Sequence, residues 1–256
     1  MTFMRYDIAT GEILAQIQCG TDSLDILATD GTAFLEGNVD PQSYWVDGSE
    51  FKEREAVTVS APSIPLMPSD ALVSVIDGLP ADAAVRVRGT NNMPVAAQIV
   101  QTQGGALFWV PNVIGSYVVQ LVGRYKADDF SFEVQPLDVV KSRRQEEVTA
   151  IKATQLAGGF IWNGKRWDAD AQAQANVTSM ASAIAAGMEL PQDFFWTSYD
   201  NEDVPIDGAG MSALSAAMMT FIFNTHSYAR SLKEAIEAEV SNASVMAVDI
   251  NSGWPA

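Results

Sequence analysis

Short runs that alternate apolar and polar residues fill the first half of the chain, and this pattern is typical of strands with one buried face. Up to residue 56 the runs lie at residues 3–8, 12–17, 33–36 and 43–46, and a charged stretch at 51–55 leads out of them. So few strands hide little surface. We therefore expect a small β module that leans on a neighbouring module.

The next segment, residues 57–136, also has a β pattern. Turn-forming residues such as Asp77-Gly78-Leu79-Pro80 separate its apolar runs, and a further turn is expected at Gly89-Thr90-Asn91-Asn92. The runs lie at residues 57–59, 72–76, 85–88, 95–100, 106–110, 117–122 and 130–134. This succession of short strands predicts a small β-sandwich of immunoglobulin-like architecture, or a barrel.

After Pro136 the apolar spacing becomes helical, with helices predicted over residues 137–156, 171–186 and 209–241. Two hairpins lie between them. The first covers residues 160–167 and turns at Asn163-Gly164, the preferred two-residue turn; the second covers 194–206 and turns at Asp200-Asn201-Glu202-Asp203. Asp168 or Asp170 would cap the middle helix. Residues 242–256 are predicted to be a loosely ordered tail.

The patterns of the first hairpin and of the long helix indicate which of their side chains lie together. With Asn163-Gly164 as the turn, Phe160 opposes Trp167, and Phe160, Trp162 and Trp167 share one face. The long helix carries an apolar stripe that packs against its own module or pairs with a copy of itself. The stripe is broader than a small module obviously needs, which favours burial in a partner or a second copy. The stripe includes Met211, Leu214, Met218, Phe221 and Ile222, and Lys233 and Glu237 are spaced to pair beside it.

The predicted fold class is multi-domain α+β. It has a small N-terminal β module at residues 1–56 and an immunoglobulin-like β-sandwich at 57–136. A C-terminal α+β module with two hairpins and a long helix follows at 137–243, and a tail at 244–256. We expect residues 137–243 to fold alone.

The net negative charge of the chain disfavours some classes of binding partner. The 256 residues include 32 Asp and Glu against 15 Lys and Arg, for a net charge of -17, while 48% are hydrophobic. Such a field repels nucleic acid and anionic lipid surfaces, so we expect no nucleic-acid partner. The N-terminus lacks the apolar core of a signal peptide, and the most apolar run, residues 216–223, is shorter than the ~20 residues that span a bilayer. We therefore expect no membrane insertion.

Few residues suggest catalysis or metal binding. His226 has no carboxylate or nucleophile at one-turn spacing, and Cys19 is interpreted as a small buried hydrophobe. One His and one Cys cannot complete a zinc site. The Asp200–Asp203 cluster lacks the longer loop of a calcium site and is interpreted as a solvated turn. Asp168 and Asp170 are better explained by helix capping than as an acid pair.

Phosphate-loop and aromatic signals are equally weak. Gly158-Gly159 precedes a hairpin, and Gly208-Ala209-Gly210 opens a helix without a lysine. The hairpin residues Trp162, Trp167 and Trp196 could stack a sugar ring or a base, but covering a small sheet is the favoured role. Met211, Met218 and Met219 suit a core or a subunit interface. We expect no enzyme activity, no catalytic residues, no cofactor and no metal.

A series of motifs in fixed order runs through residues 140–240. It comprises Gly159-Phe160, Asn163-Gly164-Lys165-Arg166-Trp167-Asp168-Ala169-Asp170, Trp196, Asp200-Asn201, residues 204–207, and a helix with His226 and Leu232-Lys233. This series resembles the uncharacterised domain at the C-terminus of many bacteriophage tail-fibre and tail-fibre-assembly proteins. The front of the chain, for example Gly115-Ser116-Tyr117, more loosely resembles small modules of phage proteins. The family has no assigned catalytic residues, so none is carried over.

The resemblance implies a structural protein of the virion tail, in a tail fibre or associated with the baseplate, that acts by contact and is assembled in the host cytoplasm. Its partners would be other phage tail proteins, and a homo-oligomer and a host-surface glycan are left open. A tail-fibre assembly chaperone absent from the mature virion is the first alternative. A carbohydrate-binding or receptor-binding module is the second; a depolymerase would need a convincing acid pair.

Overall fold

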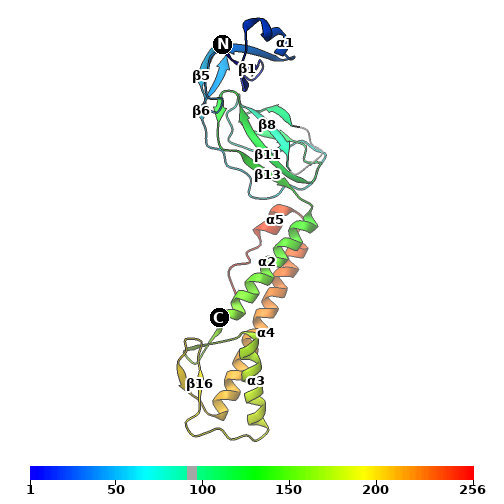
Figure 1. The fold of residues 1–256 in the computed structure, drawn as a ribbon. Coiled ribbons are helices and arrows are strands. Elements are labelled where there is room, and N and C mark those ends of the chain that lie inside the picture. Colours follow the sequence, from blue (N-terminus) through cyan, green and yellow to red (C-terminus); the bar gives the residue numbers. More distant parts are fainter. Residues whose placement is uncertain (91–96) are drawn as a thin grey trace. The chain divides into compact units, whose positions relative to one another are not determined.

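A computed structural model describes residues 1–90 and 97–256, which form two compact units, Met1–Pro136 and Leu137–Ala256 (Figure 1). The second half of the turn expected at residues 89–92 and the first two residues of the strand expected at 95–100 lie outside the described residues. The chain is a mixed α and β protein whose small sheets are mostly antiparallel, in agreement with the coarse prediction.

The first unit begins with a three-stranded antiparallel sheet in the order β2-β1-β3, formed by β1 (Thr2–Asp7), β2 (Ile13–Gln18) and β3 (Thr32–Glu36). A hairpin of β4 (Tyr44–Asp47) and β5 (Glu50–Glu53) follows. Most of the charged stretch at residues 51–55, which was not expected to be a strand, therefore belongs to β5. Two short helical turns, η1 (Thr21–Ser23) and α1 (Leu24–Leu27), were not predicted.

Two sheets share one core in the rest of this unit. The larger is antiparallel with the order β13-β11-β8-β9, and the smaller pairs β10 with β7. The strands are β7 (Val73–Ile76), β8 (Ala84–Gly89), β9 (Gln98–Gln101), β10 (Leu107–Trp109), β11 (Gly115–Val122) and β13 (Phe130–Val134). Buried Leu107, Tyr117 and Phe132 lie at the centre, and the rings of Tyr117 and Phe132 stack 4.8 Å apart. The described order does not close on itself, so these strands form no barrel.

The predicted run at residues 57–59 is not a strand. Val57 and Val59 instead pack their side chains against this core as the chain passes it. Just before them, β6 (Glu55–Ala56) pairs in parallel with β12 (Tyr125–Lys126), a two-residue strand that the sequence did not predict. The side chains of this run are partly buried, and its backbone continues from β6, with the Val57 N–H donating to the Lys126 carbonyl oxygen of β12 (3.0 Å).

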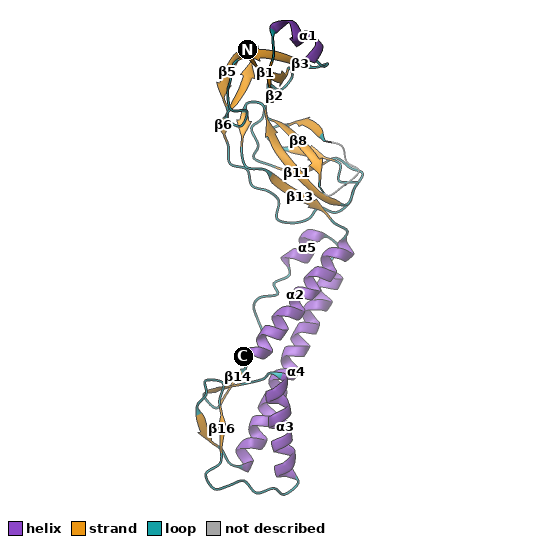
Figure 2. Ribbon diagram, viewed as in Figure 1, coloured by secondary structure: helices purple, strands orange, loops and turns teal. Residues whose placement is uncertain are grey.

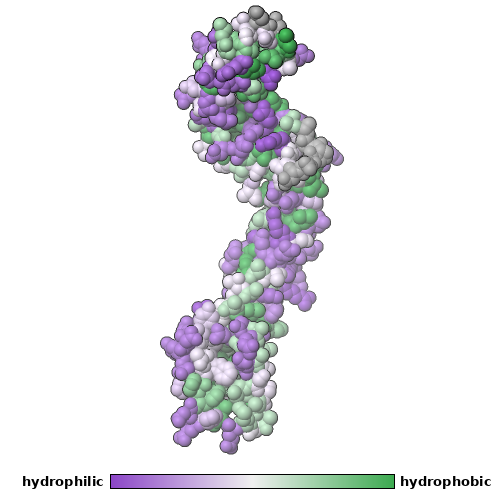
Figure 3. Space-filling view, viewed as in Figure 1, coloured by the Kyte–Doolittle hydropathy of each residue, from purple (hydrophilic) through white to green (hydrophobic). Residues whose placement is uncertain are grey.

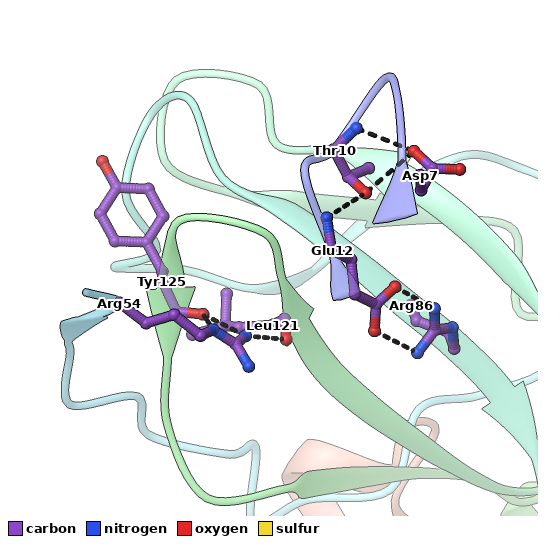
Figure 4. A network of polar contacts seen from close by, with 7 residues as sticks. All are labelled: Asp7, Thr10, Glu12, Arg54, Arg86, Leu121 and Tyr125. Atoms are coloured by element: carbon purple, nitrogen blue, oxygen red, sulfur yellow. Dashed lines mark hydrogen bonds and ion pairs between the residues drawn. The ribbon is translucent and has the colours of Figure 1, made fainter. Parts of the chain in front are cut away.

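Polar contacts hold the small N-terminal sheet against the strands that follow it in the same unit (Figure 4). The Arg86 guanidinium of β8 donates two hydrogen bonds to the Glu12 carboxylate; the Nη1–Oε1 distance is 2.9 Å. The Arg54 guanidinium donates to the backbone oxygens of Leu121 (2.8 Å) and Tyr125 (3.1 Å). The expectation that the small module leans on a neighbour is confirmed.

The second unit contains helices α2 (Leu137–Ala157), α3 (Ala171–Ala185), α4 (Gly208–Ala238) and α5 (Asn242–Ala247). Two hairpins, β14 (Phe160–Trp162) with β15 (Lys165–Trp167) and β16 (Phe195–Thr197) with β17 (Asp203–Pro205), lie between the helices in the chain (Figure 2). One core joins the hairpins to α3 and the first half of α4. A second core joins α2 to the second half of α4 and to the C-terminal residues. None of the described helices has the length and apolar content needed to span a membrane.

The prediction of a loosely ordered tail over residues 242–256 is wrong. Ser241 caps α5 in a capping box, and Val245 and Ile250 are buried in the core with α2 and α4. Trp254 packs edge-on against Tyr228, with ring centroids 5.1 Å apart. The segment contains apolar residues such as Val245, Val248 and Ile250, but it is too short to show a sustained helical period, so only the tertiary fold reveals that it is packed. A fragment expected to fold alone therefore extends to Ala256 rather than to residue 243.

Ile250→Val is expected to lower the free energy of unfolding of the Leu137–Ala256 unit by about 0.5–1.5 kcal/mol, because it deletes a buried methyl group. Val240→Ala, at a residue that is 80% exposed, is the control and should stay within about 0.5 kcal/mol of the wild type. Urea titration of both variants measures this. Equal stability of Ile250→Val and the wild type would mean that the segment does not pack in solution.

The apolar stripe of α4 does not need a partner, contrary to the prediction. Met211, Met218, Phe221 and Ile222 are all buried within their own unit, because the hairpins and α3 cover them. The predicted pair of Lys233 with Glu237 is also wrong. The Lys233 ammonium donates to the Thr149 hydroxyl of α2 (2.7 Å), so it joins two helices rather than two turns of one.

Candidate functional site

The first hairpin of the second unit forms as its sequence predicts. Asn163 and Gly164 both have positive φ angles, of 50° and 75°, as a tight two-residue turn requires. Phe160 pairs with Trp167, and Trp162 pairs with Lys165. The shared aromatic face is confirmed: Phe160 and Trp167 are buried in the core, and Trp162 packs against it.

Trp167 is a structural residue rather than a free binding surface. Its indole is 2% exposed, and its Nε1 donates to the Trp162 carbonyl oxygen (3.0 Å). Of the three tryptophans that could stack a ligand, Trp196 and Trp162 remain partly exposed, and they line different hollows. The structure therefore separates residues that the sequence placed in one group.

One hollow of about 470 Å³ lies between the hairpins and the first half of α3; we call it the α3 hollow. Buried side chains of α3, α4 and the first hairpin form its floor, namely Phe160, Trp167, Val177, Leu214 and Met218. Polar residues Asp168, Asp170, Gln172, Asn176 and Thr197 lie around it, and Phe194, Phe195 and Trp196 complete the lining. Apolar floors with a few convergent polar groups are typical of small-molecule sites. Figure 3 shows hydrophobic and hydrophilic patches side by side on the face of this unit that it draws.

Asp168 is the unusual polar residue of this hollow. It is partly buried, and no described residue donates a hydrogen bond to its carboxylate. Burial, followed by the nearby negative charge of Asp170, raises the pKa of Asp168, while the charge of Arg166 opposes the shift. The Arg166 side chain is engaged elsewhere: its Nε donates to the Gly158 carbonyl oxygen (2.6 Å), and its guanidinium lies 3.9 Å from the Tyr199 ring centroid.

The neighbouring polar groups have structural roles that leave part of their capacity unused. Asp170 caps α3 by accepting from the Ala173 N–H (2.8 Å), which identifies it, and not Asp168, as the cap. Gln172 Nε2 donates to Asn176 Oδ1 (2.8 Å). This bond leaves the Gln172 oxygen and the Asn176 amide nitrogen for another partner.

A second hollow, of about 900 Å³, lies beside the loop at residues 188–192. Trp167 and Phe194 line both hollows. Of its charged groups, Lys165 forms an ion pair with Glu202, Asp207 caps α4, and Glu189 is exposed on the loop. None of these groups is a partly buried carboxylate without a described donor, as Asp168 is. The α3 hollow is therefore the candidate site.

The other sequence candidates lie outside it. His226 is exposed on α4 beside a smaller open hollow with Lys152, Arg230 and Glu234. Cys19 is partly exposed after β2, not buried as interpreted. The Asp200–Asp203 turn has Asn201 at a φ of 57°, and Asp203 accepts from Thr197 (3.2 Å), in keeping with a hairpin turn. Within the parts of the chain that the structure describes, no group of three His, Cys, Asp or Glu residues could hold a metal ion.

Asp168→Asn is expected to raise the thermal midpoint of the second unit at pH 7. A carboxyl with a folded pKa above its unfolded value contributes stability below the unfolded pKa of 3.8, and this stability is lost as pH rises through the folded pKa. Asparagine does not ionise, so the gain of the variant over the wild type should be present at pH 7 and absent near pH 3. The charged groups around Asp168 are Arg166, Asp170 and Asp200.

Thermal unfolding from pH 3 to pH 7 measures this difference between variant and wild type. Asp193→Asn, in the exposed loop before β16, removes the same charge outside the α3 hollow and is the control. A loss of stability in Asp168→Asn at pH 7, or a gain equal to that of Asp193→Asn, would contradict the environment described for Asp168.

Comparison with known proteins concerns the second unit. Residues 139–251 match a family model described as a domain of unknown function, DUF4376. The match extends into the C-terminal segment with α5 and Ile250, which the structure packs into the unit. No curated protein and no solved structure matches the chain.

Proposed function

We propose that the chain is a structural component of a bacteriophage tail, in a tail fibre or associated with the baseplate, and that it acts by protein–protein contact. The observation that supports this most directly is the placement of the motifs that resemble the tail-fibre domain. Asn163-Gly164 and Asn201 form the hairpin turns, and Asp170 and Asp207 cap α3 and α4. The resemblance therefore rests on residues that shape the fold of the second unit.

The division of the chain supports a contact role as well. Each of the two compact units has its own buried core, as in proteins that connect neighbours. Exposed apolar side chains remain available for contact, including Phe223 (71% exposed) and Met219 on α4 and Ile26 (84% exposed) in the first unit. The net charge of -17 favours solubility at high local concentration before assembly.

For residues 57–136 we propose an immunoglobulin-like sandwich. The pair β7–β10 and the four-stranded sheet share one core of buried side chains, as the two sheets of a sandwich do. A crystal structure of Met1–Pro136 tests this. Two facing sheets with their strands aligned within about 30° are expected, whereas a crossing near a right angle would contradict it.

The role in the particle is tested by quantitative mass spectrometry of gradient-purified virions and of infected lysate of the phage that encodes the chain. A constant copy number per particle is expected. Abundance in the lysate without any in particles would overturn the proposal in favour of the tail-fibre assembly chaperone. The burial of the α4 stripe removes one reason to prefer a permanent component, so this measurement decides between the two roles.

A further inference from the structure

We propose that the α3 hollow binds a neutral pyranose unit of a glycan, with Asp168 accepting hydrogen bonds from sugar hydroxyls and Trp196 contacting the ring. This inference concerns a separate site and does not depend on the role in the phage tail. If the chain is found in virions but binds no glycan, only the proposed tail role stands. If it binds glycans but is absent from virions, only the proposed glycan site stands.

The shape of the hollow suits a ligand with one apolar face and a polar edge. Its volume of about 470 Å³ lies within the range of small-molecule sites. The floor is apolar and buried, whereas the surrounding residues Asp170, Gln172 and Asn176 are exposed and polar. A pyranose has the same division, because its ring carbons present C–H groups on a face and its hydroxyls project at the edge.

Trp196 is the aromatic surface placed for such a ring. It is partly exposed at the hollow and pairs across the hairpin with Val204, which packs on the same core. The ring of Phe194 lies 6.2 Å away at 45°, so Trp196 is held in position without being covered. Partly exposed tryptophans with a fixed orientation give contact area at small entropic cost.

The carboxylate of Asp168 favours a ligand that carries hydrogen-bond donors. No described side chain or backbone N–H donates to it, although it is partly removed from water. A desolvated carboxylate without donors is unfavourable until a ligand supplies them. Two adjacent sugar hydroxyls can each donate a hydrogen bond to one carboxylate oxygen of Asp168. The Gln172 oxygen can accept a hydrogen bond from a further hydroxyl, and the Asn176 amide nitrogen can donate one.

The charge of the α3 hollow disfavours anionic ligands, whereas an organic cation remains an alternative ligand to be tested. Asp168, Asp170 and the nearby Asp200 repel anionic ligands, and Arg166 does not compensate because it is held at Gly158 and Tyr199. An organic cation would also suit a carboxylate beside an aromatic ring. The neutral amides of Gln172 and Asn176 favour hydroxyls, which donate and accept, over a cationic group, which cannot accept a hydrogen bond.

The 256-residue chain is tested on an array of bacterial surface oligosaccharides, both neutral and acidic, and retained glycans are titrated by saturation-transfer difference NMR. Neutral glycans are expected to be retained and acidic ones not. Choline, as a quaternary ammonium probe, is titrated in parallel and is expected not to bind. Retention of no neutral glycan, or binding of choline in preference to the glycans, would overturn the proposal.

Matched variants place the binding in the α3 hollow. Asp168→Asn should weaken binding of the retained glycan about tenfold, because it replaces a charged acceptor, while Asp193→Asn should leave the affinity unchanged. Since Asp168→Asn is expected to be no less stable than the wild type, a loss of binding is not a loss of folding. Trp196→Leu keeps an apolar side chain but removes the flat ring and should weaken binding at least as much. Unchanged affinity in Asp168→Asn would overturn the assignment to this hollow.

Discussion

Trp167→Ala is expected to lower the free energy of unfolding of the Leu137–Ala256 unit by about 3–5 kcal/mol. The indole is 2% exposed, lies in the core with Phe160 and Met218, and bonds through Nε1 to the Trp162 carbonyl oxygen. Truncation leaves a cavity at the point where the hairpin meets α4, and it also removes the hydrogen bond. Urea unfolding followed by far-ultraviolet circular dichroism measures the loss.

Ile161→Ala is the matched control for Trp167→Ala. Ile161 lies on the same hairpin, but it points to the other face and is 58% exposed. Its truncation should change the free energy of unfolding by no more than about 0.5 kcal/mol. A Trp167→Ala protein with wild-type stability that no longer binds the retained glycan would show that Trp167 is a binding platform instead of a core residue.

Gly123→Ala is expected to destabilise the Met1–Pro136 unit by about 2–5 kcal/mol. Gly123 has a φ of 70°, and a left-handed conformation costs a residue with a Cβ about 1–2 kcal/mol. A Cβ at this position would also lie 2.1 Å from the backbone oxygen of Thr10, so the small N-terminal sheet must move away. Overpacking of this kind adds about 1–3 kcal/mol.

Gly78→Ala separates the two effects. Gly78 has a φ of 80°, and a Cβ there meets no atom within 4 Å, so this variant should lose only the conformational part of about 1–2 kcal/mol. Chemical unfolding of both variants gives the difference. Equal losses would mean that the turn at Thr10 does not approach Gly123 closely in solution.

These variants act on contacts of different range in the sequence. The Phe160–Trp167 pair spans one hairpin, and its register follows from the turn at Asn163-Gly164. The contact of Gly123 with Thr10, and the bonds of Arg86 to Glu12, join residues far apart in the chain. No periodicity within a window of the sequence could have indicated them.

The candidate site likewise combines features that are local in the sequence with features that depend on the tertiary structure. Asp168 and Asp170 were recognisable in the sequence as candidates for a helix cap, and Trp196 as an aromatic residue that could stack a ligand, whereas Gln172 and Asn176 carried no signal of a site. The spacing of Asp168 and Asp170 left the cap undecided, and only the backbone conformation at Asp170 assigned it. The lack of a donor for Asp168 depends on Arg166, whose side chain turns toward Gly158 and Tyr199, and the sequence carries no signal for that choice.

Local structure could be predicted from the sequence: both hairpins of the second unit, α2, α3 and α4, and most strands of the first unit. Turn chemistry, capping and apolar period act over a few residues, so they can be recognised without the rest of the fold. The tertiary structure alone decided that α4 buries its stripe, that residues 242–256 pack on α2 and α4, and that a hollow forms beside Asp168. Burial and unmet hydrogen bonding depend on which distant segments cover a residue, and the pattern along a chain does not contain that information.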